Sequence, residues 1–312
     1  MHWLVAIQAQ DYAGAKWAIG MRLPGSTDAD IERAFNRGEI LRTHVLRPTW
    51  HFVAPADIRW LLALTAPRVH AANGRVYKKL GLDAGVLRRG DDVLARALEG
   101  GQHLTRDELR AVLHGRRIAT NEERMAFLLM HAELEGLICS GPRRGKQFTY
   151  ALLDERARPA KRLSREEALA QLARRFLASR SPATAHDLAK WSGLTVTDAR
   201  QGLESVRIKD ELKSGVRRAP VAHLLSVYDE YFSSYRDGSA VIAAGHALRR
   251  SGTGESGLYV VTIDGAVVGR WRRARNAESV DVELNLFRRL TAPERRALRA
   301  AVERYRAFVT AH

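Results

Sequence analysis

Residues 184–203, TAHDLAKWSGLTVTDARQGL, restrict the fold of this chain more than any other segment. Thr184 and Thr195 each stand three residues before an aspartate, a spacing that caps the first turn of a helix. A Ser-Gly-Leu turn signal at residues 192–194 separates the two helix starts. The helices are predicted to share a small apolar core of Leu188, Ala189, Leu194, Ala199 and Leu203. This pattern is typical of a helix-turn-helix, which can lay its second helix along DNA.

The charge of the chain favours a nucleic-acid partner for this helix pair. Lysine and arginine number 51 against 35 acidic residues among 312, a formal net charge of +16. The excess is rich in arginine, whose planar guanidinium suits phosphates and guanine edges. An anionic membrane would be another partner, but the sequence has no long basic amphipathic helix and no apolar run of membrane-spanning length. We therefore expect a cytoplasmic protein that binds DNA and no membrane.

Most catalytic motifs are missing from the sequence. Its one cysteine, Cys139, excludes an internal disulfide and a thiolate zinc cluster. There is no GxxxxGK phosphate loop, no HExxH helix and no HxE paired with CxxC. The GTGESG stretch at residues 252–257 lacks a following lysine and is interpreted as a turn. We expect neither a metal nor a cofactor.

A second segment, residues 99–158, repeats the plan of two helices and a hairpin. Capping boxes are predicted at Thr105 and Thr120, each with a glutamate three residues later, and Gly136 ends the longer helix. A strand, a basic turn and a strand then follow, as in a winged helix. Three cations near this turn are predicted to bind phosphate, namely Arg143, Arg144 and Lys146.

The first and third segments fit the same plan. In residues 159–219, a helix capped by Ser164 precedes the helix-turn-helix, with a wing predicted at residues 206–218. Residues 1–98 are less regular. They predict helices at 12–22, 27–37 and 57–64, and two extended pieces within 40–54 that break at Pro48.

The last segment, residues 220–312, predicts a small α+β domain. Asp264-Gly265 is a favoured hairpin turn between β-rich flanks, and strands are expected at 240–244 and 279–287. A final helix capped by Thr291 is predicted to bury Leu298, Ala301, Val302, Tyr305 and Phe308. Alternation along the second hairpin strand predicts Trp271 and Arg273 buried, and Arg270 and Arg272 exposed for phosphate contact. The predicted fold class is α+β, mainly α, with tandem winged helices before this domain.

Gln8 and Gln10 flank Ala9 near the start of the chain, in the stretch AIQAQ. In an extended segment, residues two apart face the same side, whereas on a helix they would diverge. Two carboxamides cannot act as a general base, but they can hold a water molecule by donating and accepting hydrogen bonds. That would suffice only for a reaction whose leaving group is already activated. On spacing alone, the favoured interpretation is that they hold neighbouring backbone.

Four blocks of this sequence resemble the AlkZ-like family of bacterial winged-helix DNA glycosylases: IQAQDYAGAKWAIGMR, RTHVLRPTWHFV, LLSVYDEYFSSYRDGSAV and IDGAVVGRWRR. The similarity runs from the first residues to the last and implies tandem winged helices with a C-terminal domain. It also implies removal of alkylated purines, with interstrand crosslinks unhooked by some members. The family's catalytic signature is Gln, an apolar residue, then Gln or Asp, which implies that Gln8 and Gln10 are catalytic.

The family's helix upstream of the glutamines is largely missing here, so we expect that preceding residues are absent from the sequence. Arg42, Arg47, Thr49 and His51 lie in or beside the second block and are predicted DNA contacts. A second interpretation stays open, in which His51 satisfies a local carbonyl and Trp50 packs. For Asp229, Glu230, Tyr231 and Arg236, an internal ion-pair network is the expected role.

The resemblance and the residues agree chemically. A purine alkylated at N7 carries a positive charge, so its glycosidic bond is already weakened and a positioned water suffices. Asp11 could stabilise positive charge on the sugar, but capping a helix is its favoured role. We expect a monomeric, monofunctional glycosylase that acts on alkylated, including crosslinked, double-stranded DNA. The alternative is a noncatalytic winged-helix DNA-binding protein such as a transcription regulator. An RNA-binding protein is disfavoured, because the sequence has no aromatic RNA-platform motif.

Overall fold

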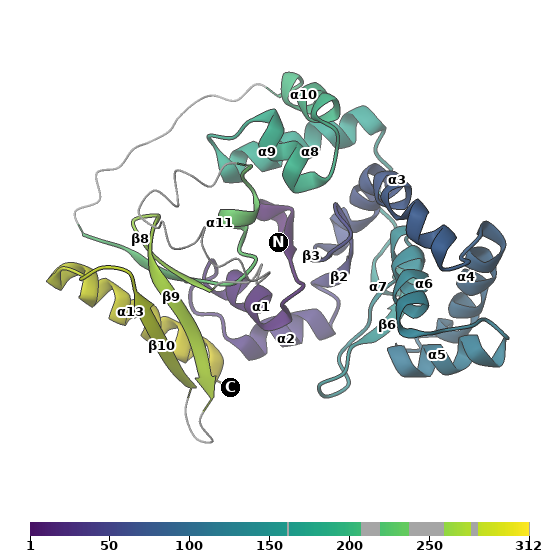
Figure 1. Cartoon of the computed structure of the whole chain (residues 1–312), viewed down its shortest axis with the longest axis horizontal. Helices are drawn as coiled ribbons and strands as arrows, with labels where there is room; N and C mark the ends of the chain where they lie inside the picture. Colours follow the sequence, from purple (N-terminus) through teal and green to yellow (C-terminus); the bar gives the residue numbers. More distant parts are fainter. Residues whose placement is uncertain (161, 207–218, 237–258, 276–279, 312) are drawn as a thin grey trace. The chain divides into compact units, whose positions relative to one another are not determined.

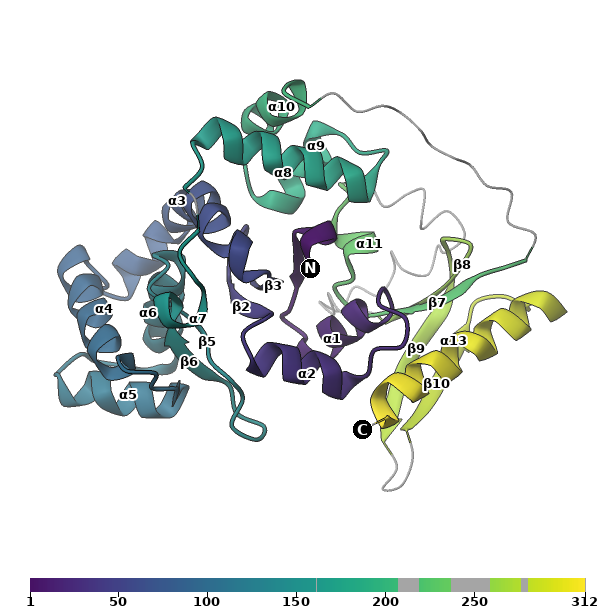
Figure 2. The ribbon, with the colours of Figure 1, turned by 180° about the vertical axis from the view of Figure 1, so that it is seen from behind.

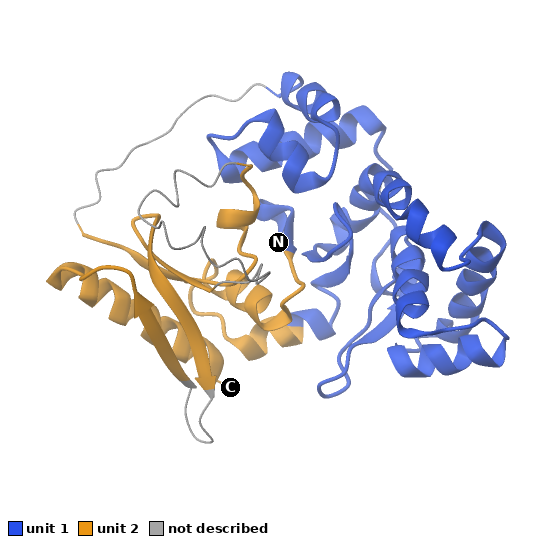
Figure 3. Ribbon diagram, in the orientation of Figure 1, with its two compact units in different colours: residues 1–7, 34–206 blue, residues 8–33, 207–312 orange. Residues whose placement is uncertain are grey.

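The computed structural model describes residues 1–160, 162–206, 219–236, 259–275 and 280–311. These residues form two compact units (Figure 3). Unit 1 comprises residues 1–7 and 34–206, and unit 2 comprises residues 8–33 and 207–312. Both units are therefore built from segments that are distant in the sequence. The finer division at residues 98, 158 and 219 stays a prediction.

The first part of unit 1 combines a small sheet with a long helix (Figure 1). Its elements are η1 (His2–Leu4), β1 (Ala6–Gln8, whose last residue belongs to unit 2), β2 (Leu41–His44), β3 (Trp50–Val53) and α3 (Pro55–Lys79). The strand order is β1-β3-β2, with β2 and β3 antiparallel, so the two predicted extended pieces are confirmed. The prediction of a helix that ends at Leu64 is wrong, because α3 continues through Pro67 and buries Val69 and Tyr77.

The middle of unit 1 contains helices around a second three-stranded sheet (Figure 2). Its elements are α4 (Ala84–Leu98), β4 (Leu104–Thr105), α5 (Arg106–Gly115), α6 (Glu122–Leu134), β5 (Ile138–Ser140), β6 (Thr149–Leu152) and α7 (Leu153–Arg156), with strand order β4-β6-β5. The capping box at Thr105 is confirmed. The box predicted at Thr120 is wrong, because Asn121 caps α6 by accepting a hydrogen bond from the Arg124 amide. Asparagine is as good a cap as threonine, so the helix begins one residue later.

The helix-turn-helix is the last part of unit 1. It consists of α8 (Arg165–Arg180), α9 (Ala185–Ser192) and α10 (Val196–Glu204), and its three predicted capping boxes are all confirmed. Gly193 ends α9 at a φ of 74°, and a Cβ placed there would lie 2.5 Å from the Leu46 carbonyl oxygen. Only glycine fits both requirements. Of the wing predicted at 206–218, residues 207–218 lie outside the described part of the chain.

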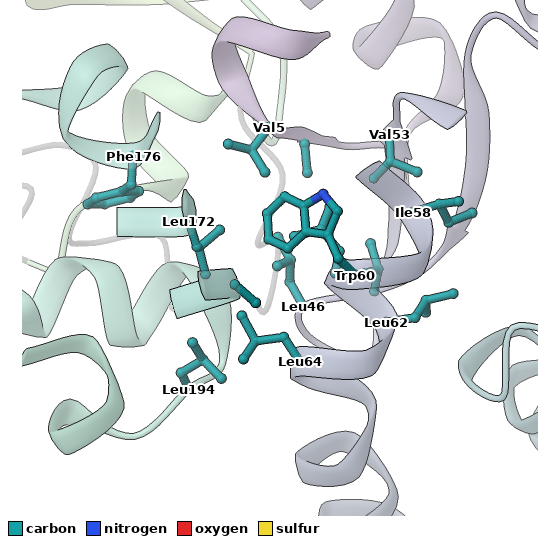
Figure 4. Close-up of a cluster of buried hydrophobic side chains, with 14 of the residues drawn as sticks. Val5, Leu46, Val53, Ile58, Trp60, Leu62, Leu64, Leu172, Phe176 and Leu194 are labelled. Atoms are coloured by element: carbon teal, nitrogen blue, oxygen red, sulfur yellow. The ribbon is translucent and has the colours of Figure 1, made fainter. Parts of the chain in front are cut away.

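Large apolar side chains connect the helix-turn-helix to the first part of unit 1. Trp60 of α3 lies among side chains from β1, α3 and α8 (Figure 4). Leu188, Ala189, Leu194 and Ala199 of the predicted core are buried in the same cluster, and Leu203 packs against it. A second cluster joins α4, α5 and α6 around Leu94, Leu109 and Leu128. Burial of each such side chain is worth about 1.5–3 kcal/mol.

Unit 2 combines two N-terminal helices with a C-terminal sheet and helix. Its elements are α1 (Tyr12–Gly20), α2 (Asp28–Asn36, which ends in unit 1), β7 (Ala222–Leu225), α11 (Glu230–Ser233), β8 (Val260–Ile263), β9 (Ala266–Arg275), β10 (Val280–Leu286) and α13 (Ala292–Thr310). The antiparallel sheet has the order β10-β9-β8-β7. Asp264 and Gly265 both have positive φ, which confirms the predicted hairpin turn.

The five apolar residues predicted for the last helix are the buried residues of α13. Strand β7 had no sequence prediction. The strand expected at 240–244 and the GTGESG turn at 252–257 lie outside the described residues. Within the described ranges, no helix has both the length and the apolar character needed to cross a membrane.

Helix α1 is fixed within unit 2 through Trp17. The Trp17 indole donates a hydrogen bond to the Leu224 carbonyl at 2.6 Å, and its ring lies 5.0 Å from Tyr305 and 5.1 Å from Phe308. A Cβ on Gly20 would clash with the Phe308 ring. The helix that follows the two glutamines therefore packs closely on the C-terminal helix.

Candidate active site

The two glutamines lie where β1 ends and before α1 begins. Gln8 is half-buried, Ala9 is fully buried and Gln10 is exposed. This alternation is what an extended segment with both glutamines on the face opposite Ala9 would give. Water can reach both positions, as the proposed chemistry requires.

A buried carboxylate holds the backbone of Gln8. Glu230 begins α11, is 3% exposed, and accepts a hydrogen bond from the Gln8 amide at 2.9 Å. Its other carboxylate oxygen accepts a hydrogen bond from the Ser234 hydroxyl at 3.2 Å. No pattern in the sequence predicted that Glu230 contacts Gln8, although each of them lies in a block that resembles the family. The end of β1 is thus tied to the C-terminal part of unit 2.

A second carboxylate, Asp229, anchors the end of α1. Arg22 donates two hydrogen bonds to the fully buried Asp229, at 2.8 and 2.6 Å. Burial opposes the charged guanidinium, but the hydrogen bond and charge of Asp229 outweigh it and raise the pKa of Arg22. Tyr231 donates a hydrogen bond from its hydroxyl to the Gly265 carbonyl at 3.0 Å. The expectation of internal ion pairing is confirmed for Asp229.

Asp11 connects the glutamine segment to the sheet of unit 2. One of its oxygens accepts the Gly14 amide hydrogen and caps α1, which confirms the predicted cap. The other accepts a hydrogen bond from the Tyr259 hydroxyl. Burial, followed by this hydrogen bond to Asp11, raises the pKa of Tyr259. No sequence motif singled out Tyr259, because it belongs to none of the four blocks.

The predicted DNA contacts around β2 and β3 belong to unit 1, and two of them are buried. Arg42 is 8% exposed, and its guanidinium lies 4.2 Å from the Trp50 ring centre and 4.6 Å from that of Phe148. His51 is 0% exposed, with Nδ1 2.9 Å from the Thr49 carbonyl oxygen. This burial favours the second interpretation of His51. Arg47 and Thr49 are half-buried.

The three cations near the turn between β5 and β6 differ in their environments. The Arg143 guanidinium lies 4.5 Å from the Phe148 ring centre. Arg144 is exposed and forms an ion pair with Glu108 at 2.7 Å. Lys146 is exposed. A phosphate that bound Arg144 would compete with Glu108.

The prediction for β9 is half correct. Trp271 is 4% exposed and donates a hydrogen bond to the Leu225 carbonyl, while Arg272 is exposed and pairs with Glu283. Arg273 was expected to be buried and Arg270 exposed, but both are half-buried. An arginine can bury its stem and keep its charged end in water, so strict alternation fails for it.

Unit 2 also contains a cavity of about 580 Å³. Arg22, Tyr231 and Asp264 are among its lining residues, whereas neither glutamine is. The cavity is therefore separate from the glutamine site.

Comparison with known proteins identifies the family. The family model described as DNA glycosylase AlkZ-like matches residues 1–308. An interstrand DNA cross-link repair glycosylase from Streptomyces sahachiroi is 25% identical over 90% of this chain and 81% of its own length. The structure of DNA glycosylase AlkZ from the same organism is similar with a TM-score of 0.77 and 21% identity, covering 97% of this chain and 88% of that one. The chain therefore belongs to the AlkZ-like family of DNA glycosylases, enzymes that hydrolyse N-glycosyl bonds in DNA.

Proposed function

We propose that this enzyme removes purines alkylated at N7, including crosslinked ones, from double-stranded DNA, with Gln8 and Gln10 positioning the attacking water. The observation that carries this proposal is the solvent access of both glutamines at a strand end whose backbone is fixed by Glu230. The name of the Streptomyces relative, an interstrand DNA cross-link repair glycosylase, supports the substrate class.

The proposed hydrolysis requires only that the side chains position a water molecule. Breaking the bond between C1′ and N9 of an N7-alkylated purine releases a neutral base, because the positive charge on the base takes up the bonding electrons. Water then attacks C1′ and loses a proton. Carboxamide oxygens accept hydrogen bonds from this water, and carboxamide N–H groups donate to it. The buried Glu230 fixes where Gln8 stands, and a fixed position lowers the entropic cost of reaction.

For DNA binding we propose that the helices and hairpins of residues 1–219 are tandem winged helices that follow the duplex backbone. Lys146, Arg144, Arg47, Thr49, Arg270 and Arg272 stay predicted contacts. Arg42 and Arg143 would have to leave the aromatic rings that they cover to contact phosphate. We further propose that the enzyme acts as a monomer on the DNA of the cytoplasm. Membership of a glycosylase family disfavours the alternative of a noncatalytic regulator.

The direct test is release of 7-methylguanine from methylated duplex DNA under single-turnover conditions with a metal chelator present. We expect Gln8→Ala and Gln10→Ala together to slow release by about 100-fold or more, because misplacement of a reacting group costs on the order of 100-fold. Gln102→Ala is a matched control, because Gln102 is an exposed glutamine in unit 1. Unchanged release from the double variant would overturn the role of the glutamines. Absence of any released base from the unchanged protein would overturn the substrate.

A further inference from the structure

Unit 1 contains a cluster of metal-ligating side chains that the proposed glycosylase reaction does not use. It consists of His70 on α3, His131 on α6 and Glu135, the residue that ends α6. One ligand atom from each of the three lies within 4.8 Å of the other two. His131 and Glu135 are four residues apart, which places them on one face of the helix. Helices α3 and α6 pack together, so the cluster joins two elements of the same unit.

Each histidine has a partner for its Nδ1 atom. The Tyr77 hydroxyl lies 3.1 Å from Nδ1 of His70, and an Asp91 carboxylate oxygen lies 3.1 Å from Nδ1 of His131. Both contacts leave Nε2 as the atom available to a ligand. A carboxylate or hydroxyl that holds the far nitrogen of a histidine is the usual support behind a metal-bound imidazole, because it fixes the orientation and tautomer of the ring.

The contact between His70 and Glu135 is short. Nε2 of His70 is shielded from water and lies 2.9 Å from Oε1 of Glu135. A cation beside the line that joins the two atoms would satisfy both of them. Metal binding uses the lone pair of a neutral imidazole nitrogen.

The surroundings leave room for a further ligand. A cavity of about 660 Å³ is lined by both His70 and Glu135. Glu135 has 52% of its side chain exposed, so it can adjust its rotamer, whereas His131 is held at 13%. Tetrahedral Zn²⁺ with bonds of about 2.0–2.2 Å needs ligand atoms about 3.3–3.5 Å apart. Nε2 of His70 and Oε1 of Glu135 are 2.9 Å apart, and a small rotation of the Glu135 side chain would increase this distance to that value.

We infer that His70, His131 and Glu135 bind one divalent transition-metal ion, with Zn²⁺ as the best match and water in the fourth position. Two imidazoles and one carboxylate are ligands typical of Zn²⁺, and the hard ions Mg²⁺ and Ca²⁺ prefer oxygen ligands only. The ion would link the end of α6 to the middle of α3. This site is independent of the glutamines and of the proposed lesion.

The test uses full-length protein without an affinity tag, stripped of metal with a chelator and then titrated with ZnCl₂. We expect one Zn²⁺ per chain by calorimetry, and a melting temperature higher by on the order of 5 °C when Zn²⁺ exceeds its Kd about 100-fold. CoCl₂ should give the visible absorption of four-coordinate cobalt. Mg²⁺ should give no binding by calorimetry and should not change the melting temperature.

Two variants and a control locate the ion. Glu135→Gln changes an exposed residue at a helix end and should leave the fold intact while weakening Zn²⁺ binding at least about tenfold. His131→Gln should abolish the cobalt absorption. His114→Gln changes an exposed histidine of α5 and should bind Zn²⁺ as the unchanged protein does. Absence of Zn²⁺ binding to the unchanged protein would overturn the inference, as would Zn²⁺ binding by Glu135→Gln and His131→Gln that is as tight as in the unchanged protein.

Discussion

Each unit of this enzyme buries carboxylates in ion pairs, and one pair from each unit can be compared because their cationic partners differ. In unit 1, Glu133 of α6 pairs with His44 of β2, and both side chains are almost fully buried. In unit 2, the fully buried Asp229 pairs with Arg22, whose side chain is 31% exposed. A histidine can give up its charge near neutral pH, whereas an arginine cannot. Of these two pairs, the one in unit 2 must therefore keep its charged arginine, as must the buried pair of Asp57 and Arg175 in unit 1.

The two units also differ in what surrounds these pairs. Unit 1 has two large apolar clusters. The pair of Glu133 and His44 lies among helices and strands that apolar packing already keeps in place. In unit 2 the carboxylates of Asp229 and Glu230 contact the segment of residues 8–22 that contains the glutamines, and Asp11 within that segment accepts a hydrogen bond from Tyr259. Hydrogen bonds are directional and apolar packing is not. Directional contacts thus fix the position of residues 8–22, the segment that contains the candidate catalytic glutamines.

The largest expected effect tests the difference between the partners. Asp229→Asn should lower the free energy of unfolding of unit 2 by about 2–3 kcal/mol, because Arg22 keeps its charge and loses an ionised acceptor. Glu133→Gln should cost unit 1 only about 1 kcal/mol, because an imidazole, unlike a guanidinium, has an uncharged form that hydrogen-bonds an amide. Denaturant unfolding with hydrogen exchange of peptides from each unit measures both. Equal costs would contradict the comparison.

A smaller effect compares one substitution in the two units. Gly20→Ala in unit 2 should destabilise by about 1–2 kcal/mol, because the new methyl group meets the Phe308 ring. Gly74→Ala, in the exposed middle of α3, meets nothing within 4 Å and should stabilise unit 1 by about 0.5–1 kcal/mol. Thermal melting of the two variants should show shifts of opposite sign. A stabilising Gly20→Ala would mean that α1 does not pack on α13 in solution.

The smallest effect concerns exposed ion pairs, Arg144 with Glu108 in unit 1 and Arg272 with Glu283 in unit 2. Alanine at either arginine should change stability by less than about 1 kcal/mol. If the arginine contacts one phosphate, the slope of log K against log salt should become shallower by about 0.9. Fluorescence anisotropy with duplex DNA at several salt concentrations shows which unit loses a contact. An unchanged slope for both variants would show that neither Arg144 nor Arg272 contacts a DNA phosphate.

The features that the sequence predicted correctly depend on contacts within one or two turns of the backbone. The boxes at Thr105, Ser164, Thr184, Thr195 and Thr291 depend on hydrogen bonds across three residues, and all five are present. The Asp264-Gly265 turn likewise depends only on its own two φ angles. The sequence did not predict features that depend on residues distant in the chain, such as the burial of Arg42 against the Trp50 and Phe148 rings.

The family and the glutamine pair could thus be predicted from the sequence alone, because a motif is a local pattern of side chains. Only the tertiary structure decided that residues 8–33 pack with the C-terminal part of the chain, and that Glu230 holds Gln8. Contacts between residues more than two hundred positions apart depend on how whole elements pack, and no local spacing records that.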